Sequence, residues 1–261
     1  MNQSIGLRTR ALGALLAGLV LGATLASAAP APAPASVYAA ALAAPGRSAQ
    51  DRERDARDKP AEVLEFAGFK PGMRIADIFG GGGYYSEILA SIVGPGGKVL
   101  LVNDPAYASF AAKGIAERFK DGRLAEVERR VVPNEALGLG QGTLDGALFV
   151  MSYHDLYFED KNGFPHIDAA QFLDQVHTAI KPGGLLLIVD HSALPGTGNA
   201  PAQTLHRIDE KFAISDISSH GFKLLKTYDG LKHPEDDRLK GVFDEAIRGK
   251  TDRFVHLYRR T

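Results

Sequence analysis

Cysteine is absent from the 261 residues of this chain. The absence excludes disulfides, thiolate metal sites and a lipid-anchored lipoprotein. After the N-terminal region, no stretch is apolar enough to span a membrane. The chain also has no excess of positive charge, because it contains 30 Lys and Arg and 31 Asp and Glu. Since the chain lacks the basic footprint of a nucleic-acid-binding protein, we expect a small-molecule substrate and no nucleic-acid partner.

The first residues differ from the rest of the chain. Arg8 and Arg10 precede an apolar stretch over 11–25, and Ala26-Ser27-Ala28 has the small-x-small pattern of a signal-peptidase site. We therefore expect residues 1–28 to be a cleaved signal peptide, with an uncleaved anchor as the alternative. A cleaved signal predicts a periplasmic or secreted protein with no membrane span.

The segment after the expected cleavage site is rich in Ala and Pro. Its composition predicts a disordered tether over residues 29–46. The remainder has an ordinary globular pattern in a chain that is 45% hydrophobic and 23% charged. We expect residues 47–261 to form a single domain, which is long enough for one sizeable core.

Buried strands alternate with amphipathic helices along this domain. Strands are expected at 73–78, 98–103, 125–132, 145–152, 185–190, 222–228 and 252–259, and core helices at 84–93, 106–120, 168–180 and 202–220. Such alternation predicts an α/β fold with a doubly wound, mostly parallel sheet and helices on both faces. The last two strands lack a clear helix between them, so we expect an antiparallel pair at one edge. The ligand of such a sheet lies at the carboxyl ends of its strands.

Four consecutive glycines follow the first strand, in "IADIFGGGGYYSEIL" at 75–89. Glycine permits positive φ and lets a ligand lie against the backbone, and the helix behind it presents free N–H groups. The spacing does not match the G-x-G-x-x-G of a dinucleotide site, because Tyr85 and Ser86 stand where glycine is required. Asp77, just before the loop, would repel a pyrophosphate but attract a cation. The loop therefore favours a cationic adenosine ligand.

At this point the chain resembles the class I S-adenosylmethionine-dependent methyltransferases. The resemblance covers roughly residue 51 to the C-terminus and is closest to their predicted exported bacterial branch. It is carried by the glycine loop and by "RDARDKPAEVL", "KPGGLLLIVD", "VDHSA", "LHRIDE" and "TDRF". It implies a seven-stranded sheet with an antiparallel last strand, S-adenosyl-L-methionine as cofactor, and an N-terminal helical lid. The charged stretch "DRERDARDK" would form that lid or be a mostly solvated face.

The resemblance also implies which residues bind the cofactor. The family motif D-x-G-x-G-x-G falls on Asp77, Phe79, Gly81 and Gly83, with Phe79 in place of the first glycine and Gly80 and Gly82 in the variable places. Asp77 would face the methionine end of the ligand. The ribose position, at the end of the second strand, falls on Asn103 with Asp104 beside it. We expect Tyr84 to face the ligand and Tyr85 to pack in the core.

The adenine contact of the family falls after the third strand, on Asn134 or Glu135. The alternative is that both residues form a polar turn after Pro133.

The catalytic candidates lie just after the fourth and fifth strands. Methyl transfer to oxygen needs an aligned acceptor and a group that takes its proton. His154, in "SYHDLYF", is our candidate for the base or for an acceptor-orienting group, with Asp155 steadying the imidazolium and His191 as second choice. The alternative is that His154 is a loop histidine or a helix cap.

Asp155 and Asp190-His191 are also similar to the metal site of catechol-type O-methyltransferases. Oxygen ligands suit Mg²⁺ or Ca²⁺, whereas the imidazole of His191 suits a transition metal. Our prediction assigns no metal ion and keeps this site as an alternative.

The segment "LHRIDE" at 205–210 is expected on a helix, where His206 and Glu210 would share a face. Arg207 could pair with a substrate carboxylate or belong to a surface helix with salt bridges. Two functions remain open. The first is S-adenosylmethionine-dependent methyl transfer to an unknown acceptor, which we expect to be a small molecule. The second is an exported non-enzymatic or repurposed ligand-binding module on the same fold.

Overall fold

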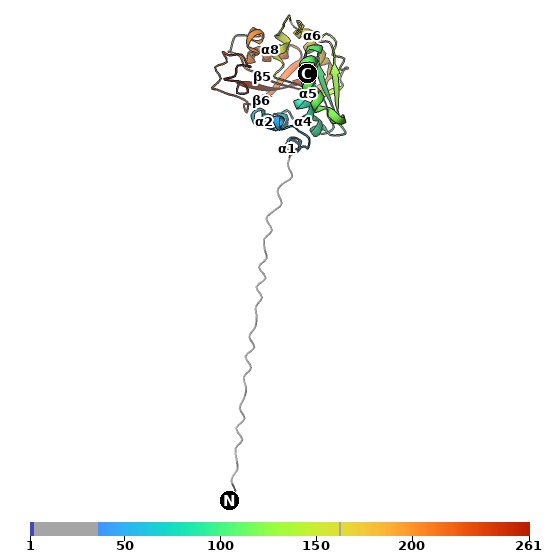
Figure 1. Cartoon of the computed structure of the whole chain (residues 1–261), viewed down its shortest axis with the longest axis vertical. Coiled ribbons are helices and arrows are strands. Elements are labelled where there is room, and N and C mark those ends of the chain that lie inside the picture. The colour runs from blue at the N-terminus through green and yellow to red at the C-terminus, as the bar shows by residue number, and fades with distance from the viewer. Residues whose placement is uncertain (3–35, 162) are drawn as a thin grey trace. The chain divides into compact units, whose positions relative to one another are not determined.

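A seven-stranded sheet forms the centre of the molecule, and Figure 1 shows helices on both of its faces. The strands are β1 Arg74–Ile78, β2 Lys98–Asn103, β3 Val127–Val131, β4 Leu144–Val150, β5 Ile180–His191, β6 Phe222–Thr227 and β7 Arg253–Arg260. Their order is β3-β2-β1-β4-β5-β7-β6. The first five strands are parallel, and β7 runs antiparallel to both β5 and β6. The fold class predicted from the sequence is confirmed.

This computed structural model describes residues 1–2, 36–161 and 163–261. Nearly all of the expected signal peptide and the start of the expected tether therefore lie outside the described residues. From residue 36 onward the chain forms one compact unit. Within the described residues, no helix combines the length and apolar character that a membrane crossing requires.

The helices divide between the two faces of the sheet. They are α1 Val37–Leu42, α2 Ala49–Asp58, α3 Pro60–Ala67, α4 Tyr84–Val93, α5 Pro105–Arg118, α6 Ala169–Ala179, α7 Ala202–Leu205 and α8 Glu210–Ser219, with 3-10 turns η1 Lys120–Gly122 and η2 His154–Tyr157. Buried side chains of α3 and α4 share one hydrophobic cluster, and those of α6 and α8 share the other. Figure 1 shows α6 and α8 on one side of the sheet and α2 and α4 on the other.

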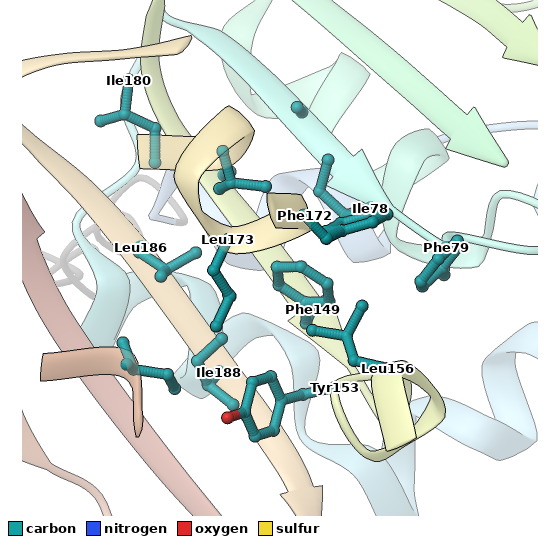
Figure 2. Packing of buried hydrophobic residues seen from close by; sticks show 14 of the residues in the cluster. Ile78, Phe79, Phe149, Tyr153, Leu156, Phe172, Leu173, Ile180, Leu186 and Ile188 are labelled. Atoms are coloured by element: carbon teal, nitrogen blue, oxygen red, sulfur yellow. The ribbon is translucent and has the colours of Figure 1, made fainter. Parts of the chain in front are cut away.

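Aromatic residues fill the core on the α6 and α8 face. Figure 2 shows Phe149 of β4 next to Phe172 of α6, and their ring centroids are 6.1 Å apart. Phe79, directly after β1, packs on the same group, with its ring centroid 5.2 Å from that of Phe172. Burial of these large rings is a major stabilising contribution. Because the cluster extends to the end of β1, it also anchors the loop that follows this strand.

The strand register places the candidate site at one edge of the sheet. Ile78, the last residue of β1, pairs with Val102 of β2 and with Phe149 of β4. The residues that follow these three strand positions therefore meet at the same edge. The strand order reverses between β1 and β4, which is where ligands bind in open α/β sheets.

The expected tether is wrong for residues 37–46. Residues 37–42 form α1, whose Ala41 is buried and whose N-cap Ser36 accepts a hydrogen bond from the Ala39 amide. The Tyr38 hydroxyl donates to the Phe69 carbonyl at 3.0 Å. Alanine favours helix, and packing against α3 and α4 stabilises so short a segment.

Two further boundaries differ from the sequence prediction. The "KPGG" segment, expected to separate a helix from the fifth strand, is part of β5, which begins at Ile180. The expected helix over 202–220 is broken, because His206 has a left-handed backbone with φ 51° and α8 begins only at Glu210. His206 and Glu210 therefore do not share a helix face.

Candidate active site

The glycine loop after β1 requires an unusual backbone. Phe79, Gly81 and Gly83 have φ of 51°, 55° and 82°. Positive φ is easy for glycine but strained for a bulky residue such as phenylalanine. The Phe79 ring stacks on Tyr107, with centroids 4.7 Å apart. This buried contact offsets the strain and explains how phenylalanine occupies a position where the family motif has glycine.

Gly80 holds the loop against the buried carboxylate before it. A Cβ at Gly80 would lie 2.5 Å from Asp77 Cγ and 2.6 Å from Leu101 Cδ1. Asp77 is 1% exposed and accepts a hydrogen bond from Ser86 Oγ at 2.7 Å. Burial raises the pKa of Asp77 to about 6, although Ser86 favours the charged form. The sequence prediction treated Gly80 as variable, whereas its neighbours leave no room for a side chain.

A small cavity lies over this loop. Its volume is about 160 Å³. It is lined by Arg54, Asp77, Phe79, Gly80, Gly81, Gly82, Tyr84, Tyr85 and Val150. Ligand pockets for small molecules are commonly about 300–1,000 Å³. A nucleoside ligand therefore requires movement of the wall formed by Arg54 of α2.

Helix α2 contains one internal ion pair and is attached to β7 and to α5 by two others. Arg54 Nε lies 2.6 Å from Asp58 Oδ2, and Arg253 of β7 lies 2.9 Å from Asp58 Oδ1. Asp51 pairs with Arg118 of α5 at 2.7 Å. Asp51 and Asp58 are buried, while Arg52, Glu53, Ala56, Arg57 and Lys59 are exposed, so the charged stretch is mostly solvated as predicted and turns two carboxylates inward. Arg54 lines the cavity over the glycine loop, and the role of α2 as a lid stays a prediction.

The predicted ribose position lies beside the glycine loop, as expected. Asn103 Oδ1 accepts from the Gly81 amide and Asn103 Nδ2 donates to the Gly81 carbonyl, each at 3.0 Å. Asp104 caps α5 by accepting from the Tyr107 amide at 2.7 Å. Both side chains therefore shape the loop and the following helix.

The predicted adenine position contains an unpartnered group. Asn134 Nδ2 donates to Asp104 Oδ2 at 2.9 Å, while Asn134 Oδ1 is buried without a hydrogen-bond partner. A buried acceptor without a donor is rare, and this oxygen could accept a hydrogen bond from an N–H group of a ligand. Glu135 is exposed and does not line the glycine-loop cavity.

The second part of the site lies at the ends of β4 and β5. His154 opens η2 and is buried, with Nδ1 2.7 Å from Asp190 Oδ1 and Nε2 3.2 Å from Asp155 Oδ1. Burial alone would lower the pKa of His154, but the Asp155 and Asp190 carboxylates raise it to about 9. The raised pKa favours the protonated imidazolium at neutral pH, which disfavours the role of base and leaves the acceptor-orienting role as the prediction for His154.

The pKa of His191 is shifted in the opposite direction to that of His154. It ends β5, and its Nδ1 lies 2.8 Å from Thr251 Oγ1. Burial, followed by the nearby His154 and Arg253 cations, lowers the pKa of His191 well below its usual value. Its ring centroid is 6.0 Å from that of His154. The two predicted catalytic histidines therefore lie together, one charged and one neutral.

Both histidines line a larger cavity of about 470 Å³. The other lining residues include Arg54, Arg57, Asp58, Tyr107, Phe110, Met151, Asp155, His206, Phe243, Arg248, Thr251 and Arg253. Val150 lines the glycine-loop cavity and Met151 lines this one, so the two cavities adjoin at the end of β4. Arg54 lines both and stands between them.

Sequence reasoning missed three contributors to this site. Arg54 was expected only within a solvated face or lid, and neither Tyr107 nor Arg253 was singled out as a site residue. Arg253 is 2% exposed and pairs with Asp58. Its place directly before the apolar residues Phe254 and Val255 is the signal that could have identified it.

Comparison with known proteins agrees with this geometry. No family model matches the chain. The ubiquinone/menaquinone biosynthesis C-methyltransferase UbiE of Hydrogenovibrio crunogenus is 25% identical over 189 residues, which are 70% of this chain and 68% of that protein.

Two solved structures share the fold. A SAM-dependent methyltransferase from Aquifex aeolicus has a TM-score of 0.56 at 19% identity, over 77% of this chain and 89% of that one. The (4+2)-cyclase SpnF has a TM-score of 0.56 at 15% identity, over 82% and 83%. The fold and the curated relatives together indicate an enzyme of the class I S-adenosylmethionine-dependent methyltransferases.

Proposed function

We propose that this protein transfers a methyl group from S-adenosylmethionine to a small molecule held in the 470 Å³ cavity. The observation that carries the proposal is the adjacency of the two cavities at the end of β4, where Arg54 lines both. One cavity contains the glycine loop and a buried carboxylate, and the other contains two histidines. This arrangement supports a donor site beside an acceptor site at the switch point of the sheet.

The charge of the glycine-loop cavity fits the cofactor, because Asp77 supplies a carboxylate for the positive end of the ligand. Asn134 does not line this cavity, but its unpartnered Oδ1 is the acceptor that we assign to an adenine amino group. When bound, the cofactor supplies an electrophilic methyl group on a sulfonium. Arg54 has to leave its place between the cavities for donor and acceptor to meet. The return of α2 would then exclude water from the site.

The acceptor cavity favours a molecule with an anionic or acidic oxygen. Arg54, Arg57, Arg248 and Arg253 line it, against the carboxylates of Asp58 and Asp155. Phe110 and Phe243 are exposed at 83% and 63% and supply apolar contact area. We assign His154 the role of orienting the acceptor oxygen, because Asp190 holds its Nδ1 and leaves Nε2 directed toward Asp155 and the cavity.

Calorimetric titration with S-adenosylmethionine tests the donor site. Wild-type protein should bind, while Asp77→Ala and Gly81→Val should lose the heat of binding. Valine is strained at Gly81 because φ there is 55°. Absence of binding at millimolar ligand would instead favour the non-enzymatic binding module, an alternative that the cyclase on the same fold keeps open.

A kinetic test addresses His154. Formation of S-adenosylhomocysteine is followed with a panel of small phenols, enols and carboxylates as acceptors. His154→Ala should lower turnover by roughly 10²-fold, because the acceptor oxygen loses the group that orients it. The affinity for the cofactor should be kept, because His154 does not line the glycine-loop cavity. An unchanged rate with a lowered melting temperature would reduce His154 to a structural role.

We also propose that residues 1–28 direct export to the periplasm or the medium. The proposal rests on Arg8, Arg10, the apolar run and Ala26-Ser27-Ala28. N-terminal sequencing of protein recovered from either compartment should give Ala29 as the first residue. Recovery of a chain that begins at Met1 from these compartments would refute cleavage.

A further inference from the structure

We infer that His154, Asp155 and His206 form a binding site for one divalent transition-metal ion. Their ligand atoms lie within 4.8 Å of one another. His154 Nε2 is 3.2 Å and His206 Nδ1 is 3.6 Å from the same atom, Asp155 Oδ1. Bond lengths of about 2.0–2.2 Å in tetrahedral geometry separate two ligand atoms by roughly 3.4 Å. Both histidine nitrogens are therefore already at ligand spacing from the Asp155 oxygen, and the two nitrogens lie within 4.8 Å of each other.

Neighbouring groups hold two of the ligands in the orientation that coordination requires. Asp190 is buried and occupies the Nδ1 side of His154 at 2.7 Å, which leaves Nε2 for a metal. The Tyr107 hydroxyl donates to Asp155 Oδ2, which leaves Asp155 Oδ1 available to bind a metal ion. A carboxylate behind a ligating histidine is the usual support of a protein metal site. Asp190 itself is not a ligand here, because its oxygens also accept from the His154 and His191 amides.

The third ligand is held by a strained backbone. His206 has φ 51°, a conformation that persists in a non-glycine residue only where the surroundings enforce it. The next residue supplies this support, because the fully buried Arg207 pairs with Asp236 at 2.8 Å and donates to the Ser192 carbonyl. The His206 ring packs against Phe158 and Phe243, with centroids 4.6 and 5.0 Å away. The strain thus places an imidazole opposite His154.

The ligand types select the ion. Two imidazoles and one carboxylate suit zinc, cobalt, nickel or iron better than magnesium or calcium. All three ligands line the 470 Å³ cavity, so further ligands can reach the ion from there. The inference deepens the proposed function and rests on it, because the ion would supply a positive charge beside the acceptor oxygen.

Titration with the metal alone tests the site independently of methyl transfer. Full-length protein, freed of any affinity tag and treated with chelator, is titrated with Zn²⁺ by calorimetry and with Co²⁺ by visible absorption. We expect one ion per chain and the absorption bands of Co²⁺ with nitrogen and oxygen ligands. His206→Asn should abolish this binding, since asparagine tolerates a left-handed backbone but lacks the imidazole. Tyr107→Phe should weaken it by roughly 10–100-fold.

The matched control is His166→Asn. The side chain of His166 is 80% exposed and pairs with Glu159, outside the cluster. This variant should bind Zn²⁺ as the wild type does. Absence of stoichiometric binding, or binding that survives in His206→Asn with its melting temperature unchanged, would overturn the inference. Because no cofactor or acceptor is present, neither result depends on whether methyl transfer occurs.

Discussion

Arg54 lies over the ring of Tyr84, with its guanidinium carbon 3.9 Å from the ring centroid. Arg54 belongs to α2 and Tyr84 is the first residue of α4, so this contact joins the lid to the glycine loop. Cation–π contacts that are desolvated contribute about 2 kcal/mol. The same guanidinium separates the two cavities. If α2 acts as the lid that we propose, its opening would therefore also join the two cavities.

The Tyr84 hydroxyl forms a hydrogen bond that should hold α2 in place over the glycine loop. It donates to Asp55 Oδ1 at 2.7 Å, and Arg47 binds the same carboxylate. A hydrogen bond to a charged group contributes about 1.5–3 kcal/mol. Tyr84→Phe should therefore make α2 open more often, and amide hydrogen exchange over residues 49–58 should accelerate roughly 10-fold or more. Exchange measured by mass spectrometry on peptides from α2 checks this.

A matched variant separates lid opening from a general loss of stability. Tyr228→Phe removes another tyrosine–carboxylate hydrogen bond, to Glu62 of α3. Its exchange over 49–58 should match the wild type. Equal acceleration in both variants, or none in Tyr84→Phe, would show that the Tyr84 hydroxyl does not hold the lid.

Gly80 and Gly82 should respond differently to the same substitution. A Cβ at Gly80 would lie 2.5 Å from the Asp77 carboxyl, whereas the nearest atom to a Cβ at Gly82 is Gly114 Cα at 3.7 Å. Overpacking of a buried site costs about 1–3 kcal/mol. Gly80→Ala should lower the free energy of unfolding by that amount, and Gly82→Ala should change it little. Urea denaturation of both variants checks the difference, and equal losses would contradict the packing argument.

The fold could be predicted because the signals were repeated along the chain. Each of β1, β2 and β4 is a short apolar run bounded by glycine, proline or polar residues, and such runs mark buried parallel strands. Local signals failed where tertiary contacts decide the backbone. The helix expected over 202–220 is interrupted at His206, and the support for that turn comes from Asp236, 30 residues further along the chain.

The sequence predicted which strand ends carry the site residues, but it did not predict the contacts between their side chains. His154, His191 and Asp77 were expected at the carboxyl edge of the sheet and lie there. The raised pKa of His154 was not foreseeable, because burial alone would lower it and only the position of Asp190 and Asp155 reverses the sign. The position of Arg54 between the cavities depends on how α2 folds back over the loop. No local pattern in the sequence encodes that arrangement.

The buried pair of Arg207 and Asp236 should be essential for the turn at His206. Asp236→Asn leaves an uncompensated guanidinium in a fully buried position. Breaking such a pair costs about 3–5 kcal/mol. The melting temperature should fall, and hydrogen exchange over 202–209 should accelerate. Asp237→Asn is the control, because Asp237 is exposed and accepts only from the Leu239 amide. Similar effects of the two variants would exclude a specific role for the pair.

The raised pKa of Asp77 should make stability depend on pH. Its pKa is about 6 in the folded protein and about 3.9 when unfolded, so protonation is favoured by folding. The stabilisation is complete below pH about 4 and is lost as pH rises through about 6. Above this range, the buried charge destabilises the protein by roughly 3 kcal/mol relative to a neutral group. Asp77→Asn should therefore raise the free energy of unfolding at pH 7.5 more than at pH 4.5, as measured by urea denaturation.

The same carboxyl should make cofactor binding depend on pH in the opposite sense. A sulfonium cation attracts ionised Asp77 and gains nothing from the protonated acid, so the affinity for S-adenosylmethionine should rise as pH increases through about 6. Calorimetry at several pH values should show this rise in the wild type and a flat profile in Asp77→Asn. S-adenosylhomocysteine keeps the ammonium of the methionine end and lacks only the sulfonium charge, so its affinity should vary much less if Asp77 acts on the sulfonium. An equal pH dependence for the two ligands would show that Asp77 does not face the sulfonium.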